Sequence, residues 1–206
     1  MPLAWSFGQI DTASLHSSNL RAAYNSSLIY PGATIGIDFP VHYITFTKYR
    51  KDSTSKSLYK LRFFSASLGY YHHQGFHDNL YILPEWVMRR SKPGPWFTEF
   101  TAGLGYSRTF LGGTTYRVDE SGNVSIVPLA GFSYAVAAVG FGVGYNYFVT
   151  KNIPVCIYSR LNLLVMFPYN STIYPRPTLE IGIIYTPPHL FERKISTIYK
   201  KKLPHS

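Results

Sequence analysis

The sequence predicts an all-β protein, a small closed antiparallel up-and-down transmembrane β-barrel of eight strands. The main support is residues 133–148, SYAVAAVGFGVGYNYF, which alternate between two kinds of side chain. One set is apolar and ends in tyrosines, while the other holds Gly140, Gly142 and Gly144 and ends in Asn146. This alternation is typical of a strand between lipid and a crowded lumen. Charged residues make up only 15% of the chain, compared with about 25% in soluble domains.

A membrane-spanning helix is the alternative for residues 125–150, which contain no charged side chain. The stretch is long enough to cross a bilayer, and Gly140 and Gly144 have the GxxxG spacing of packed membrane helices. However, a helix does not gather glycines at every second position on one face. Several other segments alternate in the same way, so we expect a strand.

Seven further segments complete the predicted barrel: residues 19–30, 33–41, 61–71, 79–90, 96–110, 155–167 and 178–187. Residues 43–60 are basic and polar and are expected to be extended chain that leads to a loop. Pro84 cannot donate to a strand ladder, so we expect a β-bulge at this residue.

The barrel is expected to span residues 19–187, flanked by a short segment at each end. Residues 1–18 resemble the remnant of a signal peptide or form a flexible N-terminus. Residues 188–206 form a basic, mobile C-terminal tail, and residues 111–132 form a long exposed loop.

Charge supports the up-and-down topology. The connections at 48–62, 89–92 and 151, together with residues 192–202, fall at one end of the predicted barrel and are strongly basic. The opposite end, which includes the loop at 111–132 and Arg176, is close to neutral. This arrangement puts both termini in the periplasm and the long loop outside the cell.

The predicted inward positions carry acidic and basic side chains. An eight-stranded barrel is filled by its own side chains, and buried carboxylates need cations or hydrogen bonds. We therefore expect an ion-pair network that plugs the lumen, formed by Asp38, Glu85, Arg89, Glu99, Arg160 and Glu180. An acid/base pair for catalysis is the alternative, although no nucleophile or histidine joins these residues.

The best metal-ligand candidates are His72, His73 and His77, beside Asp78, but a short turn does not by itself aim them at one point. We therefore assign no metal and no cofactor. The strands after residue 78 carry no histidine, which argues against a serine–histidine lipid hydrolase. The single cysteine, Cys156, excludes a disulfide framework and is expected to fill space.

The net charge of +10 could indicate nucleic-acid binding, but no recognition motif supports it. The basic residues instead predict a periplasmic rim, made of Arg89, Arg90, Lys92, Lys151, Lys200, Lys201 and Lys202. This rim could contact inner-leaflet phosphates, peptidoglycan or an acidic partner. A solvated collar around the barrel is the simpler interpretation.

Four segments, YPGATIGIDFPV, LGYYHHQGFHDNLYI, FTAGLGYSRTFLGGTTYRVDESG and FPYNSTIYPRPTLEIGIIY, span residues 30–186. They resemble a family of uncharacterised small outer-membrane barrel proteins of Bacteroidetes, with YHHxGFH as the most specific element. The resemblance implies an outer-membrane barrel and no activity.

We therefore expect a bacterial outer-membrane barrel with a filled lumen, which contacts outer-membrane lipid and serves as a structural or accessory component of an envelope complex. The alternatives are a membrane-embedded lipid-modifying enzyme, with a site near Glu85, Glu99 or the histidines, and a surface ligand binder that acts through residues 111–132.

Overall fold

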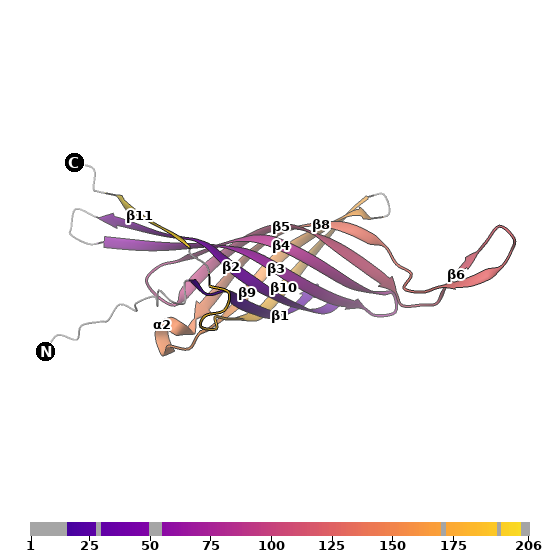
Figure 1. Cartoon of the computed structure of the whole chain (residues 1–206), viewed down its shortest axis with the longest axis horizontal. Coiled ribbons are helices and arrows are strands. Elements are labelled where there is room, and N and C mark those ends of the chain that lie inside the picture. The colour runs from indigo at the N-terminus through magenta and orange to yellow at the C-terminus, as the bar shows by residue number, and fades with distance from the viewer. Residues whose placement is uncertain (1–15, 28–29, 50–54, 170–171, 193–194, 203–206) are drawn as a thin grey trace.

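The computed structural model describes residues 16–27, 30–49, 55–169, 172–192 and 195–202. Eight strands form the main body (Figure 1): β1 (Asn19–Ser27), β2 (Tyr30–Tyr49), β3 (Ser55–His73), β4 (His77–Ser91), β5 (Trp96–Leu111), β8 (Ser133–Asn146), β9 (Val155–Tyr169) and β10 (Thr172–Tyr185). Each pairs antiparallel with its neighbours along the chain. Because β1 pairs with both β2 and β10, the sheet closes into a ring. The predicted eight-stranded barrel is confirmed.

Strand β8 shows how the sequence pattern produces the barrel wall. Tyr134 and Val136 are buried in the lumen, while Val139 and Phe141 are exposed on the outer surface. On β3, β5 and β9 too, exposed apolar side chains on the outer face alternate with buried side chains on the inner face. The outer surface is therefore apolar, as contact with lipid requires.

The helical alternative for residues 125–150 is wrong, because most of this stretch lies in β8 and in a strand of the preceding hairpin. Within the described ranges, no helix has the length and apolar character needed to cross a bilayer.

Aromatic side chains mark both rims of the barrel wall. At one rim, the Trp96 and Tyr145 rings are 5.1 Å apart and the Tyr145 and Tyr147 rings 5.0 Å apart, measured between centroids. At the other rim, Tyr106 shares a 2.7 Å hydrogen bond with Ser133. Amphipathic rings at two levels are the usual boundary of the lipid-facing band.

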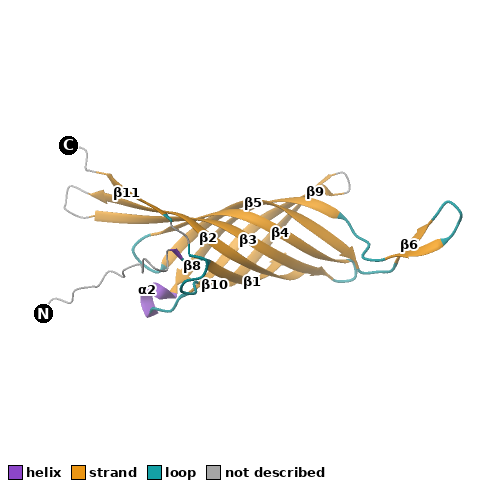
Figure 2. Cartoon of the chain, viewed as in Figure 1, coloured by secondary structure: helices purple, strands orange, loops and turns teal. Residues whose placement is uncertain are grey.

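The two ends of the barrel differ, as Figure 2 shows. One end carries the first and last described residues of the chain (16 and 202) and the short helix α2 (Tyr147–Lys151). The N-cap residue Asn146 of this helix accepts a hydrogen bond from the Phe148 backbone N–H. The other end carries a hairpin of β6 (Thr115–Val118) and β7 (Val124–Val127), where a long loop was expected. In the hairpin turn, hydrogen bonds from Asn123 and Ser121 lower the pKa of Asp119.

Strands β2 and β3 are longer than the sequence predicted. Residues 43–49 and 55–60, which were expected to be extended chain leading to a loop, pair with each other. The C-terminal tail also contains strand β11 (Ser196–Lys202), which lies parallel to β2. Residues 1–15 of the predicted N-terminal segment lie outside the described part of the chain.

The prediction of a β-bulge at Pro84 is wrong. The pairs Ile82–Tyr106 and Glu85–Gly103 have the same register on either side of this residue, and Pro84 lies on the exposed face. A register shift instead occurs on β2, between Pro40 and His42.

The glycines of β8 leave room for the lumen side chains of neighbouring strands. A Cβ atom on Gly144 would lie 2.2 Å from Cζ of Phe97 and 2.7 Å from the carbonyl oxygen of Ile157. A Cβ on Gly140 would lie 2.3 Å from Oδ1 of Asn162. Bulkier residues on this face of β8 would therefore displace what fills the barrel.

Replacing Gly144 with alanine should lower the free energy of unfolding by about 1–3 kcal/mol, the usual cost of overpacking a filled interior. Urea unfolding of the protein in detergent micelles, followed by tryptophan fluorescence, measures this change. The matched control is Gly113→Ala, because nothing lies within 4 Å of a Cβ at Gly113. Equal stability of both variants would contradict the tight packing of β8.

Candidate functional site

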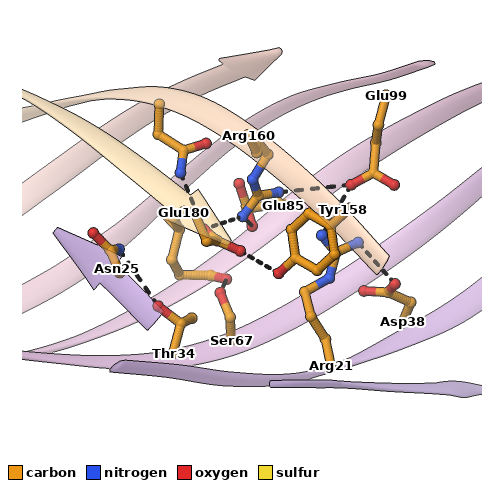
Figure 3. Close-up of polar contacts among 12 residues, drawn as sticks. Arg21, Asn25, Thr34, Asp38, Ser67, Glu85, Glu99, Tyr158, Arg160 and Glu180 are labelled. Atoms are coloured by element: carbon orange, nitrogen blue, oxygen red, sulfur yellow. Dashed lines mark hydrogen bonds and ion pairs between the residues drawn. The ribbon is translucent and has the colours of Figure 1, made fainter. Parts of the chain in front are cut away.

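The lumen holds the most distinctive chemistry in the molecule. All six predicted network residues are buried there and lie on five strands: Asp38 on β2, Glu85 and Arg89 on β4, Glu99 on β5, Arg160 on β9 and Glu180 on β10. Figure 3 shows most of them converging between the strands. Arg21 on β1, which was not among the predicted site residues, is buried with them.

Glu99 connects the arginines of the network. One carboxylate oxygen accepts a 2.9 Å hydrogen bond from Arg21 Nη1, and the other accepts hydrogen bonds from Arg89 Nη2 at 2.9 Å and from Nε at 3.1 Å. Arg160 Nη1 lies 3.9 Å from Glu99. Arg21 also donates a 2.9 Å bond to Asp38, so the carboxylates of β2 and β5 are joined through one guanidinium.

Arg160 organises a second group of carboxylates. Its Nη2 lies 2.9 Å from Glu180 and 3.6 Å from Glu85. Glu180 also accepts a 3.0 Å hydrogen bond from Asn162 and one from the hydroxyl of Tyr158. Each carboxylate thus has a cationic neighbour, as burial of a charge requires.

Aromatic rings cover the faces of two guanidinium groups. Cζ of Arg21 lies 4.7 Å from the centre of the Tyr158 ring, and Cζ of Arg89 lies 4.6 Å from that of Phe97 and 4.9 Å from that of Phe63. Cation–π contacts of this kind strengthen when water is excluded. They hold each planar group in the orientation that its carboxylate partner needs.

Arg176 lies inside the barrel, whereas the sequence predicted that it would lie in a loop at the neutral end. It is 1% exposed inside the barrel, and its Cζ lies 3.3 Å from the centre of the Tyr71 ring. Strand β10 begins at Thr172, so Arg176 belongs to the wall. With it, the charged side chains buried in the described residues number four arginines and four carboxylates, and their formal charges cancel.

The space left inside the network is small. A cavity of about 10 Å³ is lined by residues that include Asn25, Tyr81, Arg160 and Glu180. That volume is close to the minimum that a single water molecule needs. The region around Arg160 is therefore filled by side chains.

The three predicted metal-ligand candidates do not converge on one point, because His72 pairs with Asp78 while His73 and His77 pack against each other. His72 is half exposed and its Nδ1 lies 2.7 Å from Asp78, whereas the His73 and His77 rings pack edge to face at 4.9 Å. Within the described residues, no three His, Cys, Asp or Glu side chains form a group that could hold a metal.

The predicted basic rim divides into three parts. Arg89 does not belong to it, because its side chain is buried and bound to Glu99. Arg90, Lys92 and Lys151 are exposed at the end with the termini. Lys200, Lys201 and Lys202 belong to strand β11 and not to a mobile tail.

The closed ring, apolar outer surface and two aromatic rims together define a small outer-membrane β-barrel. The protein is located in the bacterial outer membrane. No family model matches the chain, and no curated protein matches it. The proposed Bacteroidetes family therefore finds no support.

Solved structures with a similar chain path include three bacterial barrels. The N-terminal β-barrel domain of Pseudomonas aeruginosa OprF is 12% identical, with 82% of this chain and 96% of that chain covered and a TM-score of 0.43. Neisserial surface protein A is 13% identical, with 82% and 94% covered and a TM-score of 0.44. The outer membrane enzyme PagL is 12% identical, with 81% and 97% covered and a TM-score of 0.37.

Replacing Glu99 with glutamine should destabilise the barrel by about 3–5 kcal/mol, because it removes the shared anion of buried arginines. Glu120→Gln in the exposed hairpin turn is the matched control, and its effect should stay within about 0.5 kcal/mol. Both are measured by urea unfolding in micelles. A Glu99→Gln protein as stable as the control would show that the network does not stabilise the fold.

Proposed function

We propose that the protein is a non-conducting, non-enzymatic barrel that anchors an accessory component of an envelope complex in the outer membrane. The observation that carries this proposal is the filled, charge-balanced lumen. A conducting barrel needs a continuous water path, whereas here arginine–carboxylate contacts run across the lumen from β1 to β5 and from β9 to β4.

Opening such a lumen would be costly. Water could pass only if Arg21 or Arg160 left its carboxylate partners, and separating a buried ion pair costs about 3–5 kcal/mol. Arg21, Arg89 and Arg160 all lie beside Glu99, so one guanidinium cannot leave without changing the surroundings of the other two. The network therefore favours a permanently closed barrel.

The same contacts argue against a catalytic role for the buried carboxylates. Glu85 and Glu99 are at most 4% exposed and lie beside arginines. A lipid substrate reaches a barrel from its outer wall or rim, whereas these groups lie inside. His72 is accessible, but its partner in the structure is Asp78.

If a closed barrel acts as an anchor, its function lies in what it presents to the periplasm. The exposed Arg90, Lys92 and Lys151 suit a collar beside lipid headgroups. Strands β2 and β3 continue past the barrel at this end and carry β11, which gives the anchor a separate periplasmic surface.

Purified protein in planar lipid bilayers should show no stepwise conductance, because side chains fill the lumen. The matched test is the double variant Arg160→Ala/Glu180→Ala, which removes a cation and an anion together and enlarges the cavity. This variant should allow passage of small ions. Stable open-channel steps from the unmodified protein would contradict the proposal and make it a pore.

A second candidate function is supported by the hairpin β6–β7. Its register pairs Tyr116 with Ile126 and Val118 with Val124, and these four apolar side chains are 60–65% exposed. A two-stranded hairpin is marginally stable alone in water, so a surface ligand could bind this face.

Replacing Tyr116 and Ile126 with serine should leave the barrel unchanged and abolish adhesion of expressing cells to a surface ligand, if this second function holds. Arg117→Ser/Ser125→Ala, which changes the neighbouring cross-strand pair, is the control. Equal adhesion of both strains to extracellular-matrix or host-cell surfaces would exclude the apolar face as a binding site.

A further inference from the structure

A three-stranded sheet extends beyond the barrel at the end with the termini (Figure 1). It consists of the final part of β2, the first part of β3, and β11. Strand β4 joins β3 only from the pair Tyr59–Ser91 onwards, so residues 55–58 have no partner in the barrel wall on that side among the described residues. The sheet projects along the long axis of the molecule, away from the lipid-facing band.

Strand register places three lysines in one row across this sheet. Lys202 lies opposite Lys48, and Lys48 lies opposite Lys56. Neighbouring strands are about 4.8 Å apart, so the register gathers three basic positions at this end of the sheet. Neither these strand segments nor the rest of β11 contains an aspartate or glutamate.

Apolar positions alternate with basic ones in the next rows toward the barrel. Lys200 lies opposite Phe46, and Phe46 opposite Leu58. In the following row, Ile198 lies opposite Ile44. Nζ of Lys60 lies 4.5 Å from the centre of the Phe46 ring. A ligand for this sheet would need negative charge and some apolar surface.

Strand β11 forms the edge of the sheet. It pairs with β2 on one side, and no described strand pairs with its other side. Lysines on an edge strand prevent association with a second copy of the same edge. That role explains Lys200 and Lys202 on β11 and Lys56 on the opposite edge, but it does not explain Lys48 on the central strand.

We propose that the sheet of β2, β3 and β11 is the docking surface for an acidic, extended segment of a periplasmic protein, which adds as a strand to the free edge of β11. Backbone hydrogen bonds would provide affinity. The lysine row would select an acidic strand and repel a basic one. This inference rests on the proposed anchoring function and names the chemistry of the partner.

A protein segment fits better than membrane phosphates because the lysine row lies at the far end of the projecting strands. Apolar residues such as Ile198, which is 38% exposed, suit alternating apolar side chains of a bound strand. The free edge also supplies backbone donors and acceptors. An added strand can pair with them in a regular ladder, whereas lipid headgroups cannot.

The test uses the full chain in a non-ionic detergent and a fluorescein-labelled peptide in which glutamate and valine alternate. Fluorescence anisotropy should show saturable binding. The variant Lys48→Gln/Lys56→Gln/Lys202→Gln should weaken binding by at least about tenfold, a change of about 1.4 kcal/mol. The matched control Arg90→Gln/Lys92→Gln/Lys151→Gln removes the same charge from the same end and should leave the dissociation constant within about twofold.

A second peptide, with proline in place of valine, keeps the charge but loses half of its backbone N–H donors and has φ fixed away from ideal strand values at every second residue. Strand addition predicts much weaker binding of this peptide. Equal binding of both peptides, or an equal loss in the control variant, would overturn the inference in favour of diffuse electrostatic attraction.

Absence of peptide binding, with lysine-dependent binding to phosphatidylglycerol vesicles, would overturn it in favour of lipid. Heat-modifiable migration in gels confirms that each variant has a folded barrel. Because bilayer conductance is measured without peptide, a closed barrel that binds no acidic peptide would refute this inference and leave the anchoring proposal intact.

Discussion

The structure depends on neutralising charge inside a closed ring of strands. Closure satisfies the backbone hydrogen bonds of the wall, but it encloses four arginines and four carboxylates on the inner face. Isolated, each would be very costly to bury. Placed together, Arg21, Arg89 and Arg160 pair with the four carboxylates, and Glu99 connects the arginines of β1, β4 and β9. Arg176 packs instead against the Tyr71 ring. The ring and the network therefore require each other: the network can form only when all of these strands meet.

The glycines of β8 provide the space that the large lumen side chains occupy. Phe97 and Arg160 extend into the lumen from the strands on either side of β8, and the glycine face leaves them room. A lumen with large residues on every strand could not close at this strand number, because a barrel of eight strands is just wide enough to be filled. Small residues on β8 and large inward side chains on its neighbours, such as Phe97 and Arg160, thus give a filled interior that resists opening.

Much of this arrangement could be predicted from the sequence because a strand has a period of two. Alternation assigned Glu99, Arg160 and Glu180 to the lumen without knowledge of their partners. Arg21 was not selected because the alternation of residues 19–30 is weak. Arg176 was misplaced because Pro175 and Pro177 on either side of it suggested a loop, although proline is tolerated where its missing N–H is not needed by a neighbour. The position of β11 was not predictable, since a short basic segment gives no signal for its pairing partner.

The most direct test of a filled lumen uses Cys156, a free cysteine on the inner face of β9 that is 6% exposed. It packs with Phe97, Tyr158 and Ile184. The measurement is the rate at which a small cationic methanethiosulfonate reagent labels the folded protein in micelles, compared with the protein unfolded in urea. A filled lumen predicts slow labelling, limited by unfolding of the barrel. Labelling of the folded protein as fast as that of the unfolded chain would show a lumen open to water and contradict the account.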